Sequence, residues 1–131
     1  MNFPGTILVV DDEAHIRKFL EIILKQLGAT SLLDANNGEE ALAIYARERP
    51  ALVLMDVNMP IMDGMQTLEK LRALDPDCAV IMLTSMANRS TVEAALEHGA
   101  INYIRKDTPK EAIIAALSET IATHFGPEKL T

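Results

Sequence analysis

The stretch that decides the fold of this 131-residue chain is residues 52–64, which read Leu52-Val53-Leu54-Met55-Asp56-Val57-Asn58-Met59-Pro60-Ile61-Met62-Asp63-Gly64. Four apolar residues without polar alternation predict a strand buried on both faces, as in a parallel sheet covered by helices. Asp56 then lies at the carboxyl end of that strand, where open α/β sheets bind their ligands. Asp63 and Gln66 have the spacing of a capping box, which predicts a helix beginning near Gly64.

Strand-like and helix-like segments alternate along the rest of the chain. Apolar runs predict further strands at residues 6–10, 30–34, 79–83 and 101–104, of which the second is the most diluted by polar residues. Apolar residues at helical spacing predict five helices that end near Leu27, Arg49, Leu74, His98 and Thr123. Five strand–helix units predict an α/β fold, an open five-stranded parallel sheet with right-handed crossovers and helices on both faces. A closed eight-unit barrel would need about 200 residues or more.

Local signals mark where several of these helices begin and end. Asn37 and Glu40 repeat the capping-box spacing at the start of the second helix. Gly28 and Gly99 follow the first and fourth helices and supply C-terminal stops. Pro109 is expected in the first turn of the last helix, where its missing N–H costs nothing.

The composition is that of one ordinary globular domain, which we expect to span residues 1–131, with residues 1–5 as an N-terminal extension and 125–131 as a tail. Hydrophobic residues make up 49% of the chain and charged residues 24%, and the net charge is −7. Without a basic run, direct nucleic-acid or membrane binding is not expected. No signal-peptide layout and no membrane-length apolar run is present, which favours a cytoplasmic protein. The single cysteine, Cys78, is expected to be a small structural residue.

Polar residues of complementary chemistry follow the predicted strands. The strand ends carry, in chain order, Asp11 and Asp12, Asp56, Thr84 with Ser85, and Lys106. Because all strand ends of a parallel sheet meet at one edge, these groups are expected to converge. Each residue alone also has a structural explanation, as a helix cap, a loop start, a solvated lysine or its ion-pair partner. Together they indicate a functional site.

The chemistry of this set indicates phosphoryl transfer onto Asp56. Three crowded carboxylates are unfavourable unless a cation is bound, and oxygen ligands without His or Cys favour Mg²⁺. A metal, an ammonium and a hydroxyl supply what a phosphoryl group needs, namely charge neutralisation and hydrogen-bond donors. A carboxylate can itself be the nucleophile and form an aspartyl-phosphate.

These motifs resemble a response-regulator receiver domain of two-component signalling, of the kind found in chemotaxis regulators. The resemblance rests on five elements in the family's order and spacing, and it covers essentially the whole chain: Asp11-Asp12, Asp56 with Met59-Pro60 and Asp63-Gly64, Thr84-Ser85, Tyr103, and Lys106. It implies a flavodoxin-like (βα)5 three-layer sandwich. It also implies that Asp56 accepts a phosphoryl group from a sensor histidine kinase or a phosphotransfer protein.

The resemblance further implies a role for each matching residue. Asp11, Asp12, Asp56 and the backbone carbonyl of Asn58 would hold Mg²⁺. Thr84 would hydrogen-bond the phosphoryl oxygens and Lys106 would pair with them, while Ser85 is small enough to leave access. Tyr103 would change rotamer as Thr84 moves, reshaping the face of the fourth helix, fifth strand and fifth helix for a downstream effector or a phosphorylation-dependent dimer.

Two positions depart from the family's pattern. The family usually has proline after the lysine, with a cis bond between them, whereas Asp107 follows Lys106 here. A cis bond without proline costs about 3–4 kcal/mol, which argues against one at this position. Met86 is expected beside the phosphoryl group, where a thioether cannot position an attacking water. We therefore expect self-dephosphorylation that is not especially fast.

The sequence favours a phosphorylated signalling module that catalyses only its own phosphorylation and dephosphorylation over two other functions. A small Asp-dependent phosphatase usually needs a second carboxylate shortly after the nucleophile and a cap over the substrate. Position 58 is Asn, and no insertion is large enough for a cap. A degenerate receiver that binds partners without phosphorylation is the other alternative. The intact acidic pair with Asp56, Thr84 and Lys106 counts against it.

Overall fold

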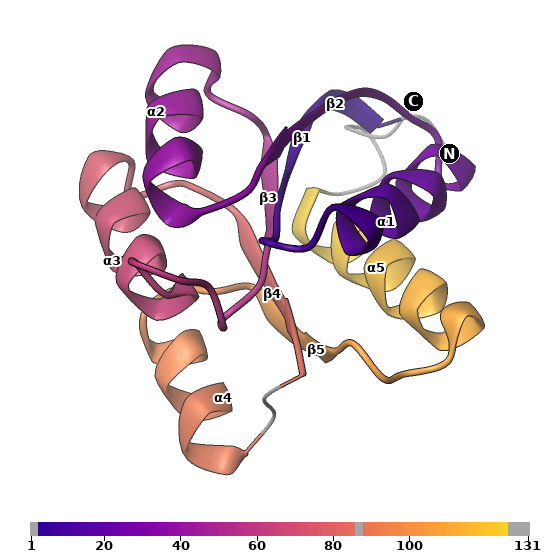
Figure 1. Ribbon diagram of the computed structural model, residues 1–131. Helices are drawn as coiled ribbons and strands as arrows, with labels where there is room; N and C mark the ends of the chain where they lie inside the picture. Colours follow the sequence, from indigo (N-terminus) through magenta and orange to yellow (C-terminus); the bar gives the residue numbers. More distant parts are fainter. Residues whose placement is uncertain (1–2, 86–87, 126–131) are drawn as a thin grey trace.

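The computed structural model describes residues 3–85 and 88–125, in which strands and helices alternate along the chain (Figure 1). The predicted alternation is confirmed. The elements are β1 (Phe3–Val10), α1 (Ala14–Gln26), β2 (Ala29–Ala35), α2 (Gly38–Glu48), β3 (Leu52–Met55), α3 (Gly64–Leu74), β4 (Val80–Thr84), α4 (Arg89–Glu97), β5 (Asn102–Arg105) and α5 (Lys110–Phe125).

The strands form one open sheet in the order β2-β1-β3-β4-β5, and all neighbouring pairs are parallel. Helices α1 and α5 cover one face, and α2, α3 and α4 cover the other (Figure 1). This is the predicted three-layer α/β fold. In the described part of the chain, none of the helices is long and apolar enough to cross a membrane.

The central strand β3 is buried on both faces, as its unbroken apolar run predicts. All four of its residues are buried. Leu52 and Leu54 belong to the core under α1 and α5, whereas Val53 and Met55 belong to the core under α2, α3 and α4. Side chains alternate across a strand, so a strand in the middle layer must be apolar at every position.

The predicted helix boundaries hold at most ends. Asp63 and Gln66 form a complete capping box, in which the Asp63 side chain accepts from the Gln66 N–H and the Gln66 side chain accepts from the Asp63 N–H. The Asn37 side chain caps α2 by accepting from the Glu40 N–H at 2.8 Å. Gly28 and Gly99 end their helices with φ of +95° and +98°, which glycine adopts without steric cost.

The first strand differs from its prediction at the N-terminal end. β1 begins at Phe3, three residues before the predicted start at Thr6, and its pairing with β2 shifts register between Phe3 and Thr6. Pro4 and Gly5 are poor strand formers, so the apolar pattern alone does not extend the strand across them. Cys78 is buried just before β4, as expected of a structural residue.

Candidate functional site

The structure brings four of the predicted site residues together at one edge of the sheet. Asp11 follows β1, Asp56 follows β3, Thr84 ends β4 and Lys106 follows β5. The strands that carry them are neighbours in the sheet. The side chains of Asp11, Asp56 and Thr84 are 1%, 3% and 0% exposed, so two carboxylates lie largely out of contact with solvent. Buried carboxylates require compensating partners.

Lys106 supplies the compensating charge for both buried aspartates. Its Nζ lies 2.6 Å from Oδ2 of Asp11 and donates a hydrogen bond of 3.1 Å to Oδ2 of Asp56. The backbone N–H of Lys106 donates to the carbonyl of Thr84 at 2.9 Å, which joins the end of β5 to the end of β4. One ammonium is thus shared between two carboxylates that face each other from neighbouring strands.

Asp11 is only partly satisfied by these contacts. Its Oδ1 accepts the Glu13 N–H at 2.9 Å, which turns the chain into α1. Its Oδ2 is buried and forms the close ion pair with Lys106, but it accepts no hydrogen bond of good geometry. A buried carboxylate oxygen without an aligned donor has room in its coordination for a cation.

The surroundings of Asp56 disfavour its charged form. Burial is the largest influence and raises its pKa; Lys106 opposes this by charge and hydrogen bonding, and the charge of Asp11 adds to the rise. A hydrogen bond with Thr84 also opposes it, yet the net pKa of Asp56 lies above its usual value of 3.8. Oδ1 of Asp56 accepts the Asn58 N–H at 3.3 Å. A cation at this carboxylate would therefore be stabilising.

Lys106 stays protonated in this environment. Burial lowers its pKa, but the close contact with the Asp11 carboxylate and the charges of Asp56 and Asp11 outweigh burial, and the net pKa lies above 10.5. Its ion pair with Asp56 does not bring the Asp56 pKa below normal, because burial of that carboxylate is the larger influence. The site therefore holds the positive charge of Lys106 beside the Asp56 carboxylate, whose negative charge this ammonium compensates only in part.

The loop after Asp56 folds tightly back onto the end of β3. The Gly64 N–H donates to the Val57 carbonyl at 2.7 Å, and a Cβ at Gly64 would lie 2.2 Å from the Asp56 carbonyl oxygen. A side chain at position 64 would thus displace the backbone of Asp56 itself. At the exposed tip of the loop, Ile61 has φ of +72°, which is unusual for a β-branched residue.

Comparison with known proteins identifies the family. The sequence model of the response regulator receiver domain family matches residues 7–118 of this chain. The chain belongs to the response regulator receiver domain family. It is 34% identical to the chemotaxis protein CheY of Bacillus subtilis over 115 residues, which is 88% of this chain and 96% of CheY. It is 45% identical to a probable transcriptional regulator, ycf27, of Porphyridium aerugineum, where the match covers 80% of this chain but 43% of the regulator.

Solved receiver structures share the fold closely. A complex of CheX and CheY with BeF3 and Mg²⁺ from Borrelia burgdorferi has a TM-score of 0.85 at 28% identity, covering 94% of this chain and 90% of that one. A receiver domain from Clostridium thermocellum has a TM-score of 0.80 at 29% identity, covering 91% and 95%. The predicted flavodoxin-like receiver fold is thereby confirmed, as is the link to two-component signalling.

The acidic residues of this receiver domain fit a divalent cation. Asp11, Asp12 and Asp56 each offer one carboxylate oxygen, and these oxygens all lie within 4.8 Å of one another. Asp12 is exposed and the other two are buried, so the site opens toward solvent on one side. Receiver domains bind Mg²⁺ at such an acidic pocket. Oδ2 of Asp11, which accepts no aligned hydrogen bond, and the raised pKa of Asp56 both fit an oxygen site for a cation.

The remaining predicted residues lie around this receiver site. Asn58 is exposed in the loop after Asp56. Tyr103 is half-buried on β5, and its pKa is raised first by burial and then by the charge of Asp56. The bond between Lys106 and Asp107 is trans, so the cis bond usual in the family is not formed. Met86, on which our expectation for dephosphorylation rests, lies outside the described residues.

Sequence reasoning missed one polar link to the receiver site. Arg17, on α1, donates from Nη1 to the carbonyl of Asp11 at 2.7 Å and from Nε to Asp34 at 3.3 Å. A signal for it was present in the pattern. Arg17 precedes the buried Leu20 and Leu24 by three and seven residues, which places it on the inward face of the helix.

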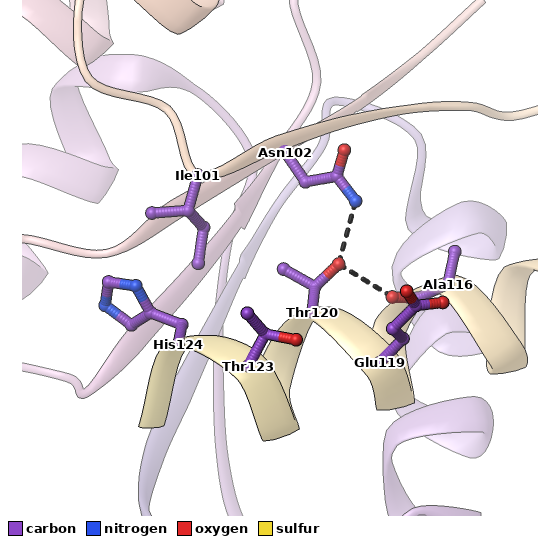
Figure 2. Close-up of a pocket in the computed structure, with 7 residues that line it drawn as sticks. All are labelled: Ile101, Asn102, Ala116, Glu119, Thr120, Thr123 and His124. Carbon is purple, nitrogen blue, oxygen red and sulfur yellow. Dashed lines mark hydrogen bonds between the residues drawn. The ribbon is translucent and has the colours of Figure 1, made fainter. Parts of the chain in front are cut away.

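A hollow of about 570 Å³ on another part of the surface contains none of the predicted site residues (Figure 2). Its walls come from the residue before β5, the first residue of β5, and α5 from its middle onward: Ile101, Asn102, Ala116, Glu119, Thr120, Thr123 and His124. Asn102 donates from Nδ2 to Thr120 Oγ1 at 2.8 Å, and that hydroxyl donates to the Ala116 carbonyl at 2.7 Å (Figure 2). These contacts join β5 to α5 at the opposite end of the strand from Lys106.

Proposed function

We propose that this receiver domain accepts a phosphoryl group on Asp56 from a sensor histidine kinase or a phosphotransfer protein, in a Mg²⁺-dependent reaction. The observation that carries the proposal is the buried Asp56 carboxylate, which has a raised pKa and lies 3.1 Å from the Lys106 ammonium and beside two more carboxylates. As part of the same proposal, residues 1–131 form a single receiver domain, supported by the family match to residues 7–118.

In this reaction an Asp56 oxygen forms a bond to phosphorus as the bond between phosphorus and the donor's imidazole nitrogen breaks. Asp11, Asp12, Asp56 and the Asn58 carbonyl would hold Mg²⁺, which supplies positive charge against the phosphoryl oxygens. Lys106 would neutralise a further oxygen, and the Thr84 hydroxyl would donate a hydrogen bond to another. The transferred group moves little and carries much charge, so fixed positive groups and donors are the main catalytic contribution.

The signal would leave the site through the edge of the sheet that carries β5. Thr84 hydrogen-bonds Asp56 before modification, and a phosphoryl group on Asp56 would draw the hydroxyl toward new acceptors. Tyr103 lies on the neighbouring strand, where Met82 of β4 pairs with it, and its phenol is sensitive to the charge of Asp56. A change in Tyr103 rotamer would then reshape the α4–β5–α5 face that an effector or a second copy recognises.

The proposal is tested by incubating the protein with Mg²⁺ and a small acyl phosphate, followed by intact-mass measurement. We expect the addition of one phosphoryl group, and its loss in Asp56→Asn. Asp77→Asn, which changes an exposed aspartate on a distant turn, is the matched control and should still be modified. An unmodified wild-type protein would favour the degenerate receiver that binds partners without phosphorylation.

A further inference from the structure

Arg17 makes a side-chain contact that ties the backbone of the loop carrying Asp11 and Asp12 to α1 and β2. Its Nη1 donates to the Asp11 carbonyl at 2.7 Å, a short distance for a nitrogen donor and an oxygen acceptor. Its Nε donates to Oδ2 of Asp34 on β2 at 3.3 Å. The side chain of Arg17 is 16% exposed, so this guanidinium is held between two strand ends instead of extending into solvent.

Apart from the ion pair of the Asp11 carboxylate with Lys106 at 2.6 Å, the other contacts of this loop are few. The Asp11 N–H donates to the Ala35 carbonyl at 3.1 Å, and the Glu13 N–H donates to the Asp11 carboxylate at 2.9 Å. Glu13 is the N-cap of α1 but its side chain makes no capping hydrogen bond. The Asp11 carbonyl is therefore fixed by Arg17, and the peptide that starts with this carbonyl leads directly into Asp12.

We propose that Arg17 is a positioning residue for the divalent-cation site. Arg17 donates a hydrogen bond to the Asp11 carbonyl and another to Asp34. These two contacts fix the backbone that carries the Asp11 and Asp12 side chains. This inference rests on the proposed function, because it concerns the cation that the proposed reaction requires. It assigns to α1 and β2 a part in cation affinity, although neither element contributes a ligand.

A positioning role for Arg17 and the effect of its charge alone predict opposite changes in Mg²⁺ affinity when the side chain is removed. A positive charge near a cation site repels the cation, so on charge alone its removal would tighten Mg²⁺ binding. If Arg17 positions the loop, its removal loosens the ligands and weakens binding. Residues that orient metal ligands from outside typically change metal affinity about 10- to 100-fold when mutated. The sign of the change therefore decides between the two effects.

The test measures Mg²⁺ binding by isothermal titration calorimetry for the wild type, Arg17→Gln and Lys18→Gln. Lys18 is the exposed neighbour of Arg17 on α1, so both variants remove one positive charge from the same helix. We expect Arg17→Gln to bind Mg²⁺ about tenfold more weakly than the wild type. Lys18→Gln should bind within about twofold of the wild type, or more tightly, because the charge it removes is solvated.

Two further variants separate positioning from general stability. Arg17→Lys keeps the charge but lacks the planar guanidinium whose separate Nε and Nη1 donors bind Asp34 and the Asp11 carbonyl, so its affinity should fall between those of the wild type and Arg17→Gln. Asp34→Asn leaves the carbonyl contact in place and should change affinity less than Arg17→Gln does. At saturating Mg²⁺ the phosphorylation rate of Arg17→Gln should approach that of the wild type, whereas a general loss of folded protein would lower it at every Mg²⁺ concentration.

Distinct results overturn distinct claims. If Arg17→Gln binds Mg²⁺ as tightly as Lys18→Gln, or Arg17→Lys matches the wild type, the positioning role is wrong and the proposed function is untouched. If the wild type itself shows no Mg²⁺ binding, the cation site and the positioning role both fall. Should Arg17→Gln fold poorly, Arg17→Lys and Asp34→Asn still carry the comparison.

Discussion

Asp56 and Asp75 are the same side chain in opposite environments. Asp56 is buried among carboxylates at the strand ends, and its pKa is raised. Asp75 ends α3, where it accepts the Tyr45 hydroxyl at 2.8 Å and lies 3.6 Å from the Arg49 guanidinium. The pKa of Asp75 is lowered, first by the Tyr45 hydrogen bond and then by the Asp77 N–H.

The difference separates a carboxylate whose charge the fold leaves under-compensated from one whose charge the fold stabilises. The fold stabilises the negative charge of Asp75 with its own donors, so Asp75 gains nothing from an added cation. It leaves the charge of Asp56 under-compensated, so Asp56 gains from a bound cation. Functional sites are where folds tolerate such unfavourable placement.

The largest effect is expected from removing the Lys106 ammonium, which pairs with both Asp11 and Asp56. Lys106→Met leaves two buried carboxylates facing each other, which should lower the free energy of unfolding by about 3 kcal/mol without Mg²⁺. Urea unfolding at neutral pH measures this, and added Mg²⁺ should recover part of the loss. Lys110→Met, at an exposed lysine of α5, is the control. A loss no larger than that of the control would show that Asp11 and Asp56 do not depend on Lys106.

Neutralising the two aspartates should change stability in opposite directions. The folded state holds a proton on Asp56 more tightly than the unfolded chain does, so ionised Asp56 destabilises the fold near neutral pH. Asp56→Asn should therefore raise the free energy of unfolding, by a gain on the order of 1 kcal/mol, as is common when a functional residue is replaced. Asp75→Asn should lower it. Urea unfolding without Mg²⁺ compares the two variants, and a shared direction would refute the contrast.

The pH dependence of the Tyr45–Asp75 pair follows from the sign of its shift. Because the pKa of Asp75 is lowered in the folded state, its contribution to stability is present above 3.8 and is lost as the pH falls further. Tyr45→Phe removes the main cause of this shift. The stability difference between wild type and Tyr45→Phe should thus shrink on acidification from about pH 5 to about pH 2. A difference that stays constant over this range would contradict the assignment.

The smallest effect is expected at the residue that stands where the family usually has proline. Asp107 accepts two hydrogen bonds from Arg105, at 3.0 and 2.7 Å, but both side chains are more than half exposed. Exposed ion pairs contribute little, so Asp107→Ala should lower the free energy of unfolding by less than about 1 kcal/mol. Its phosphorylation rate should stay near that of the wild type. A large loss of rate would mean that this pair helps to place Lys106.

The strand ends could be predicted because they follow from periodicity and topology alone. An apolar run that meets Asp56 marks the end of a buried strand, and parallel order sends every strand end to one edge. The same logic placed Asp11, Thr84 and Lys106 there. The family pattern of these residues supplied their proposed roles, which no apolar spacing could provide.

Contacts between elements could not be predicted in the same way. The hydrogen bonds Arg17–Asp11 and Tyr45–Asp75 each join two segments. How far one segment is shifted along the other depends on how the helices pack on the sheet. Periodicity tells which face a residue occupies but not which side chain of another element it meets. The shared position of Lys106 between two carboxylates is of the same kind, since it requires the register of neighbouring strands.

The strand order has a consequence for when the site comes into existence during synthesis. Asp11 and Asp56 come from neighbouring strands β1 and β3, whereas their shared ammonium arrives with β5, 50 residues after Asp56. Contacts of such long separation form only when most of the chain has been made and has folded. A ribosome-bound chain that stops before β5 carries Asp56 without Lys106. On the proposed function, the site would be complete only once β5 has been made and has paired with β4.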